Sequence, residues 1–341
     1  MKEEERNNNP PDANPYAKDI SAEQKRKIDG LRQAAEKIRI ELGKAIIGQR
    51  EMIDLLAVAV LVEGHVLIEG VPGIAKTLTA KCLAKTLDIE FRRVQFTPDL
   101  MPSDIIGTSV FNPKTTDFEF RSGPLFSNVI LIDEINRAPA KTQSALFEVM
   151  EERQITADGT TYSMSRPFIV IATQNPIDQE GTYRLPEAQL DRFLFKIEVG
   201  YPNIEEETLI LAERHKCKHT AESPDISAVL SRAEIFEFRD TIHSLHIEEK
   251  LLRYICAIVG QTRNNPFIYL GASPRASLGI MHAAKAFAAI RGRYFVTPED
   301  IKDVAVHVLR HRIMLTPEKE MEGETPDLAV RQIIERVEVP R

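Results

Sequence analysis

Gly70-Val71-Pro72-Gly73-Ile74-Ala75-Lys76-Thr77 is the stretch of this sequence that decides the fold. An apolar run at 65–69 precedes it, and apolar residues at helical spacing follow it from 78 to 87. This order of strand, glycine-rich turn and helix is typical of a loop that holds a triphosphate with backbone N–H groups and the positive end of a helix. We predict that Lys76 neutralises the β- and γ-phosphates of ATP and that Thr77 binds a magnesium ion.

Ala75 departs from the usual pattern of such loops, which has its last glycine at this position. A small side chain still lets the phosphate approach, so residues 70–77 remain the predicted nucleotide-binding loop. The alternative is a turn rich in glycine and proline that binds no ligand, and the neighbouring motifs argue against it.

The composition is that of a soluble globular protein with room for two domains. The chain has 341 residues, of which 43% are hydrophobic and 28% charged, as is usual for this class. The net charge of −7 gives no overall field that would recruit nucleic acid or an anionic membrane. The longest apolar run, residues 55–62, is too short to span a bilayer.

The first twenty residues and the cysteines indicate the compartment. Residues 1–20 are acidic and rich in Asn and Pro, without the apolar core of a signal peptide, so we predict a disordered tail on a cytoplasmic protein. Cys82, Cys217 and Cys256 are odd in number and far apart. This argues against a disulfide framework and fits a reducing compartment.

Apolar runs that alternate with helical patterns predict an α/β fold. Two helices are expected first, at 28–46 and 50–61. Besides the strand before the loop, continuous apolar runs predict strands at 91–96, 129–132, 168–172 and 193–199. Such runs suit strands that are buried on both faces, so we expect a five-stranded parallel sheet between two layers of helices.

Two segments interrupt this alternation, and both are predicted to be β-hairpins. The first has strands at 109–111 and 118–120, and the second has strands at 154–156 and 162–164 around the turn Asp158-Gly159. After residue 202 helical periodicity dominates. We therefore predict a nucleotide-binding core at 21–202, which carries both hairpins, and a helical lid domain at 203–341.

The apolar strand at 129–132 delivers two carboxylates, Asp133 and Glu134, at its C-terminal end. In a doubly wound sheet this is the edge at which ligands bind. Asp133 is predicted to hold hydrated magnesium, and Glu134 to polarise a water molecule against the γ-phosphate. Two solvated acids at the start of a loop are the alternative, but Lys76 and Thr77 favour the functional interpretation.

From residue 46 to about residue 298 the chain resembles the AAA+ ATPases, and more closely their MoxR group. The order and spacing of several motifs carry this resemblance, because none of the later motifs is specific alone. Besides the loop, the matching motifs are Ile47-Gly48-Gln49, Ile132-Asp133-Glu134-Ile135-Asn136-Arg137-Ala138-Pro139, Ala172-Thr173-Gln174-Asn175-Pro176, Leu185-Pro186-Glu187-Ala188-Gln189-Leu190-Asp191-Arg192-Phe193 and Gly271-Ala272-Ser273-Pro274-Arg275-Ala276. The resemblance implies an AAA+ αβα core followed by a helical lid, with ATP at their junction, in a ring that we expect to be a hexamer.

The resemblance also assigns roles to single residues. Asn175 matches the position called sensor 1, whose amide holds the attacking water or the γ-phosphate; a simple turn before proline is the alternative. Arg192 matches the arginine finger, which reaches the ATP of a neighbouring subunit and can raise the rate ~10³–10⁵-fold. The alternative for Arg192 is an ion pair with Asp191 or Glu187 in its own chain.

Further residues take roles from the same resemblance. Arg275 matches sensor 2, an arginine of the lid that touches the γ-phosphate of its own subunit, and a solvated arginine at a helix start is its alternative. Gly48 is expected at the adenine. Gln95, at the end of the second strand, is predicted to tether Glu134 until a client binds.

The hairpins resemble those of the AAA+ branch that includes magnesium-chelatase ATPase subunits and replicative helicases. In helicases such hairpins carry basic side chains to DNA. Here Lys114 is offset by Asp117 in the first turn, and the second turn carries Asp158 and no base. We therefore predict a protein client, which the MoxR resemblance implies carries a von Willebrand factor A domain; structural padding at a subunit interface is the plainer interpretation of both hairpins.

Two other function classes stay open from the sequence. A DNA-dependent motor is the first, and the acidic balance counts against it. A nucleotide-binding scaffold without hydrolysis is the second, and intact Lys76, Asp133, Glu134 and Arg192 argue against it. A metal site at His215, Cys217 and His219 is disfavoured, because Cys217 points away from the helix face that the two histidines share.

Overall fold

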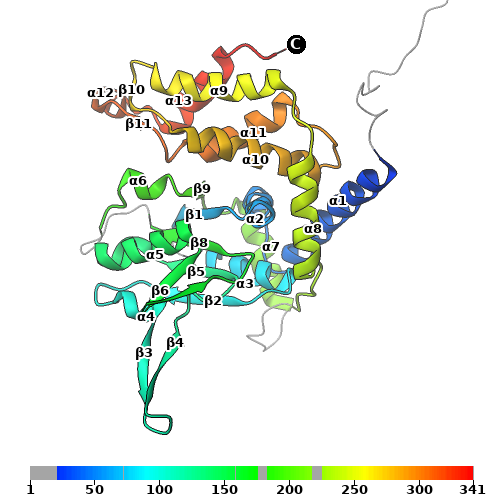
Figure 1. Ribbon diagram of the computed structural model, residues 1–341. Helices are drawn as coiled ribbons and strands as arrows, with labels where there is room; N and C mark the ends of the chain where they lie inside the picture. Colours follow the sequence, from blue (N-terminus) through cyan, green and yellow to red (C-terminus); the bar gives the residue numbers. More distant parts are fainter. Residues whose placement is uncertain (1–20, 72, 158, 176–182, 217–224, 341) are drawn as a thin grey trace, which may run out of the picture.

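The computed structural model describes residues 21–71, 73–157, 159–175, 183–216 and 225–340. Its centre is a five-stranded sheet in the order β2-β5-β8-β1-β9, with every neighbouring pair parallel (Figure 1). The predicted α/β architecture is therefore confirmed, whereas the predicted tail at 1–20 lies outside the described residues. The strands are β1 (His65–Gly70), β2 (Phe91–Gln95), β5 (Val129–Asp133), β8 (Ile169–Gln174) and β9 (Phe193–Val199).

Alternate residues of the central strands enter two hydrophobic cores, one on each face of the sheet. In β1, Val66 and Ile68 join the core that contains residues of α1, α2 and α3. Leu67 joins the other core, together with Phe147 and Met150 of α5. This burial on both faces explains why the strands read as continuous apolar runs. The helices of this part are α1 (Ala22–Gly43), α2 (Arg50–Val62), α3 (Lys76–Thr86), α4 (Pro102–Ile106), the short 3₁₀ helix η2 (Ile135–Arg137), α5 (Ala140–Glu152) and α6 (Glu187–Leu190).

Both predicted hairpins are present. The first pairs β3 (Gly107–Asn112) with β4 (Asp117–Ser122), and it projects from the body of the molecule in Figure 1. The second pairs β6 (Gln154–Ala157) with β7 (Thr160–Ser163); Asp158 of its turn lies outside the described residues. The hairpins touch through Phe120 and Tyr162, whose stacked rings are 4.5 Å apart, so the first hairpin has a fixed base.

The C-terminal part is mainly helical, and Figure 1 shows α10 and α11 between the sheet and α9. The predicted helical lid also contains a small antiparallel pair that was not predicted, β10 (Ile268–Leu270) with β11 (Met314–Leu315). The boundary near residue 202 stays a prediction; β9 ends three residues before it, at Val199. The helices of this part are α7 (Ile204–Lys216), α8 (Arg232–Ser244), α9 (Glu249–Arg263), α10 (Pro274–Ile290), α11 (Pro298–Leu309), α12 (Pro317–Met321) and α13 (Pro326–Arg336).

In the part of the chain that the structure describes, every helix is too short or too polar to cross a bilayer.

Candidate active site

The predicted phosphate-binding loop joins the end of β1 to the start of α3. Gly73 has φ +88°, a left-handed backbone conformation that favours glycine. Ala75, the N-cap of α3, is also left-handed, with φ 61°. An alanine in that region costs about 1 kcal/mol relative to glycine, so the departure seen in the sequence falls where the backbone calls for glycine. Pro72 lies outside the described residues.

Lys76 closes the loop on itself. Its Nζ donates to the carbonyl oxygen of Gly70 at 2.6 Å, so the ammonium lies across the mouth of the loop. Burial lowers the pKa of Lys76, while the charges of Asp133 and Glu134 act to raise it. The ammonium is therefore near enough to the two carboxylates at this edge of the sheet to feel their charge.

The segment 47–49 lies against the same loop. The side-chain amide of Gln49 donates to the carbonyl oxygen of Ile74 at 3.1 Å. Gly48 is left-handed, and a Cβ added there would lie 2.4 Å from a carboxylate oxygen of Glu206 in α7. Gly48 thus lies in a narrow space between the loop segment and α7, and its contact with adenine stays a prediction.

Asp133 ends β5 and is almost fully buried, at 7% exposure. Its Oδ2 accepts hydrogen bonds from Thr77 Oγ1 at 3.5 Å and from Arg93 Nε at 2.6 Å. Its Oδ1 accepts a hydrogen bond from Thr173 Oγ1 at 3.1 Å. A hydroxyl and a carboxylate at this separation form an oxygen donor set of the kind that Mg²⁺ prefers. Thr77 and Asp133 therefore fit the metal-binding role predicted for them.

Glu134 follows Asp133 in a left-handed conformation, with φ 56°. Gln95 Nε2 donates to Glu134 Oε2 at 2.8 Å, and Arg137 Nε lies 2.9 Å from the same oxygen. The backbone N–H of Glu134 donates to Thr173 Oγ1 at 3.1 Å. The contact on which the predicted tether depends is thus present, and its release by a client stays a prediction.

Asn175 comes directly after β8. Gln174 is the register partner of Glu69 in β1, so Asn175 lies level with Gly70, where the phosphate loop begins. The C-terminal edge of the sheet therefore brings Lys76, Thr77, Asp133, Glu134 and Asn175 together.

Arg192 lies at the opposite edge of the sheet. It precedes β9, and Phe193 pairs with His65 at the start of β1. β1 has six residues, so roughly 16 Å of strand separates Arg192 from the phosphate loop of its own chain. Its Nη1 donates to the carbonyl oxygen of Phe147 and lies 3.8 Å from Glu151 Oε2, rather than pairing with Asp191 or Glu187.

Arg275 lies beside Arg192. Its Nη2 donates to Glu151 Oε1 at 2.6 Å, and Glu151 follows Met150, whose carbonyl oxygen is 3.2 Å from His65 Nε2 at the start of β1. The prediction that Arg275 touches the γ-phosphate of its own subunit is therefore not supported. The two arginines share one carboxylate at the N-terminal edge, a strand length away from Lys76.

The matches to known proteins agree with this geometry. Residues 65–195 match the family model described as the ATPase family associated with various cellular activities (AAA), and residues 260–333 match the AAA lid domain. The chain is 42% identical to Chaperone MoxR1 of Mycobacterium tuberculosis over 90% of its own length and 82% of that protein. This chain belongs to the MoxR family of AAA+ ATPases.

Two other relatives align with nearly the whole length of this MoxR-family protein. Protein MoxR of Methylorubrum extorquens is 30% identical over 91% of this chain and 96% of its own length. A proposed ATPase from Cytophaga hutchinsonii, known from a crystal structure, is 42% identical. That structure superposes with a TM-score of 0.86 and covers 94% of this chain and 98% of its own.

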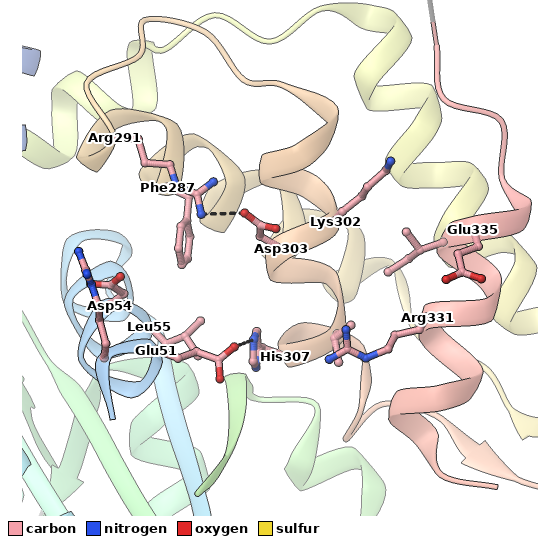
Figure 2. Close-up of a pocket in the computed structure, with 13 residues that line it drawn as sticks. Glu51, Asp54, Leu55, Phe287, Arg291, Lys302, Asp303, His307, Arg331 and Glu335 are labelled. Carbon is pink, nitrogen blue, oxygen red and sulfur yellow. Dashed lines mark ion pairs between the residues drawn. The ribbon is translucent and has the colours of Figure 1, made fainter. Parts of the chain in front are cut away.

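Near the loop of this MoxR-family ATPase, core and lid line an open pocket of about 670 Å³ (Figure 2). It lies between α2 and the lid helices α10, α11 and α13, and His307 Nε2 lies 3.1 Å from Glu51 Oε1 at its wall. Glu51 comes two residues after Gln49, which bonds the loop. Since none of the described loop residues lines the pocket, it adjoins the phosphate site without being part of it.

Four side chains of this MoxR-family site had no predicted role: Arg93, Arg137, Glu151 and Thr173. Thr173 bonds both Asp133 and the backbone of Glu134, and its place two residues before Asn175 in a matching motif was a usable signal. Arg93 shares a strand face with Gln95. Arg137 lies three residues after its partner Glu134 in a matching motif, so it too had a local signal. Glu151 has none, because its partners Arg192 and Arg275 come from distant parts of the chain.

Most of the residues of the metal alternative lie outside the described part of the chain. His215 is exposed on α7, and Cys217 and His219 lie outside the described residues. In the part of the chain that the structure describes, no cluster of three or more His, Cys, Asp or Glu could hold a metal ion.

Proposed function

We propose that this MoxR-family ATPase hydrolyses ATP with magnesium in a hexameric ring and uses the energy to remodel or mature a protein partner in the cytoplasm. One observation supports the proposed ring. The groups for binding and chemistry lie at one edge of the sheet, and Arg192 and Arg275 lie at the other. Since roughly 16 Å of strand separates the two sets, a complete site needs the arginines of a second subunit.

Within one subunit, the residues at the C-terminal edge divide the work. Lys76 neutralises phosphate charge, and Thr77 and Asp133 would hold the magnesium ion. When bound, that ion offsets the charge of the phosphates and helps to orient them. Glu134 accepts a proton from the attacking water, and Asn175 orients that water or the γ-phosphate.

Across the interface, Arg192 and Arg275 stabilise the charge that develops on the γ-phosphate of the neighbour. Both are exposed enough to reach a partner, with side-chain exposures of 29% and 43%. This arrangement makes the subunit contact heterologous, as a closed ring requires. It also replaces the predicted role of Arg275 within its own subunit by a role in trans.

A protein fits the hairpins better than a nucleic acid does. Near the tip of the first hairpin, Phe111 and Phe118 are 51% and 68% exposed, and their rings are 5.5 Å apart. Lys114 is balanced by Asp117 and Glu119, so no basic cluster is offered to phosphates. The name Chaperone MoxR1 of a relative points the same way, and we propose a client with a von Willebrand factor A domain.

Dilution tests the proposal. The ATPase rate per subunit should fall as the protein is diluted, in parallel with the loss of ring mass, because each site needs a neighbour's arginines. Removal of magnesium should abolish turnover at every concentration. A constant rate per subunit in a sample shown to be monomeric would refute the shared site.

A further inference from the structure

Glu151 joins the two arginines that come from different domains. It lies at the C-terminal end of α5 in the core, one residue before the last residue of that helix. Arg192 belongs to the core segment before β9, and Arg275 belongs to the first turn of α10 in the lid. The carboxylate uses a different oxygen for each, at 3.8 Å from Arg192 Nη1 and 2.6 Å from Arg275 Nη2.

These contacts leave each guanidinium with donors to spare. Arg192 uses Nη1 for both Glu151 and the carbonyl oxygen of Phe147, and Arg275 uses Nη2 for Glu151. A guanidinium has five N–H donors. Among the described residues, the side-chain N–H groups of Arg192 other than those on Nη1, and of Arg275 other than those on Nη2, make no hydrogen bond or ion pair. An incoming phosphate can therefore be bound without release of Glu151.

A second contact fixes the same junction between core and lid. Asp191, next to Arg192, accepts a hydrogen bond from Ser273 Oγ at 2.9 Å, and Ser273 is the N-cap of α10. Arg312, which is nearly fully buried, donates from Nε to Asp191 Oδ1 at 2.7 Å. The backbone positions of Arg192 and Arg275 are therefore held relative to each other, and what remains to be set is the direction of two long side chains.

We propose that Glu151 is a positioning residue for hydrolysis in the neighbouring subunit, since it aims Arg192 and Arg275 together at one γ-phosphate. The inference rests on the proposed trans role of the arginines. Without the shared carboxylate, two adjacent positive charges repel each other and the side chains spread. Glu151 is 39% exposed, and ion pairs of this kind contribute little to stability, so its loss should spare the fold.

Mixed assemblies test the proposal. A Lys76→Ala subunit keeps its arginines and serves as donor, and an Arg192→Ala subunit keeps its phosphate loop and serves as acceptor. Their mixture should recover hydrolysis at donor–acceptor interfaces. Glu151→Gln on the donor should lower the recovered rate roughly ten- to hundredfold, as expected for a small misplacement of catalytic groups.

Three controls separate positioning from damage to the fold. Glu151→Gln on the acceptor alone should leave the recovered rate unchanged, since that subunit's own arginine edge is not used. Glu152→Gln on the donor changes the same charge at the adjacent, exposed carboxylate and should have no effect. Glu151→Asp on the donor keeps the charge and should recover part of the rate.

The outcomes are distinct. If the original mixture recovers nothing although mass shows mixed rings, the trans role itself is wrong. If it recovers activity and Glu151→Gln on the donor leaves that activity the same or raises it, the arginines act in trans and Glu151 does not position them. If Glu151→Gln lowers the recovered rate equally on the donor and on the acceptor, Glu151 has a structural role only, and this result would also overturn the proposal.

Discussion

His65 and Phe193 are register partners at the first positions of the parallel strands β1 and β9. This pairing fixes Arg192, one residue earlier, at the edge of the sheet where β1 begins. The phosphate loop starts where β1 ends, at Gly70. Since parallel strands place all their beginnings at one edge, Arg192 lies a strand length away from the phosphate loop of its own chain.

Lys76 and Glu134 should separate ATP binding from ATP hydrolysis. Lys76→Ala should lose much of its ATP affinity, because phosphate charge is left without its partner. Glu134→Gln should bind ATP normally while hydrolysis falls ~10²-fold or more, because the amide keeps the shape but accepts no proton. Nucleotide titration and single-turnover rates measure the two effects, and near-normal turnover in Glu134→Gln would remove it from the catalytic role.

Arg275→Ala should be rescued by a neighbour. This subunit keeps its own phosphate loop, so a Lys76→Ala subunit beside it can supply the missing guanidinium if Arg275 acts in trans. The mixture should recover hydrolysis as the Arg192→Ala mixture does, which serves as the positive control. Recovery with Arg192→Ala but not with Arg275→Ala would return Arg275 to the ATP of its own subunit.

Gln95→Ala should raise the basal ATPase rate several-fold. The amide of Gln95 lies 2.8 Å from Glu134 Oε2, and loss of this hydrogen bond frees the carboxylate to reach the attacking water. The client should then stimulate the variant less than the wild type. An unchanged basal rate with unchanged stimulation would show that the contact is incidental.

The first hairpin should serve the client and not DNA. Turnover should be insensitive to single- or double-stranded DNA at physiological salt, because neither hairpin offers a basic cluster. Deletion of residues 114–117 should weaken the response to a client with a von Willebrand factor A domain and leave ATP binding in place. Strong stimulation by DNA that Lys114→Ala abolishes would favour a DNA-dependent motor instead.

Acid should destabilise the fold through His65. Burial lowers the pKa of His65 from 6.5 to about 4, and its Nδ1 accepts a hydrogen bond from Val170 N–H at 3.0 Å, which protonation would break. Below about pH 6.5 the unfolded chain binds a proton that the folded chain excludes. The free energy of unfolding should therefore decrease as the pH falls from about 6.5 to about 4, by about 3 kcal/mol for this residue.

Chemical denaturation at several pH values measures this effect. His65→Asn, whose side chain does not titrate in this range, should have a smaller slope by about one proton in that window. Burial also lowers the pKa of His311 well below 6.5, so His311→Asn is the matched comparison and should remove a similar part of the slope. Identical slopes in wild type and His65→Asn would contradict the assignment.

Much of the fold and of one half of the site follows from local sequence. The strand, loop and helix around Lys76 follow one another along the chain, so residues 65–87 alone predict the phosphate-binding loop. Asp133, Glu134 and Asn175 directly follow apolar strands, and a parallel sheet collects such positions at a single edge. Gln95 also stands at the end of a predicted strand, and its contact with Glu134 at this edge was predicted from that position.

The other half depended on packing between domains. The place of Arg275 is set by how the lid lies on the core, through contacts such as the hydrogen bond of Ser273 to Asp191 across 82 residues of chain. Glu151 carries no motif, since its role comes from two arginines that are distant in sequence. The sequence alone determined the chemistry at the nucleotide edge, because those residues are placed by single strands and turns; only the tertiary structure decided the arginine edge, because no local pattern encodes the orientation of one domain on another.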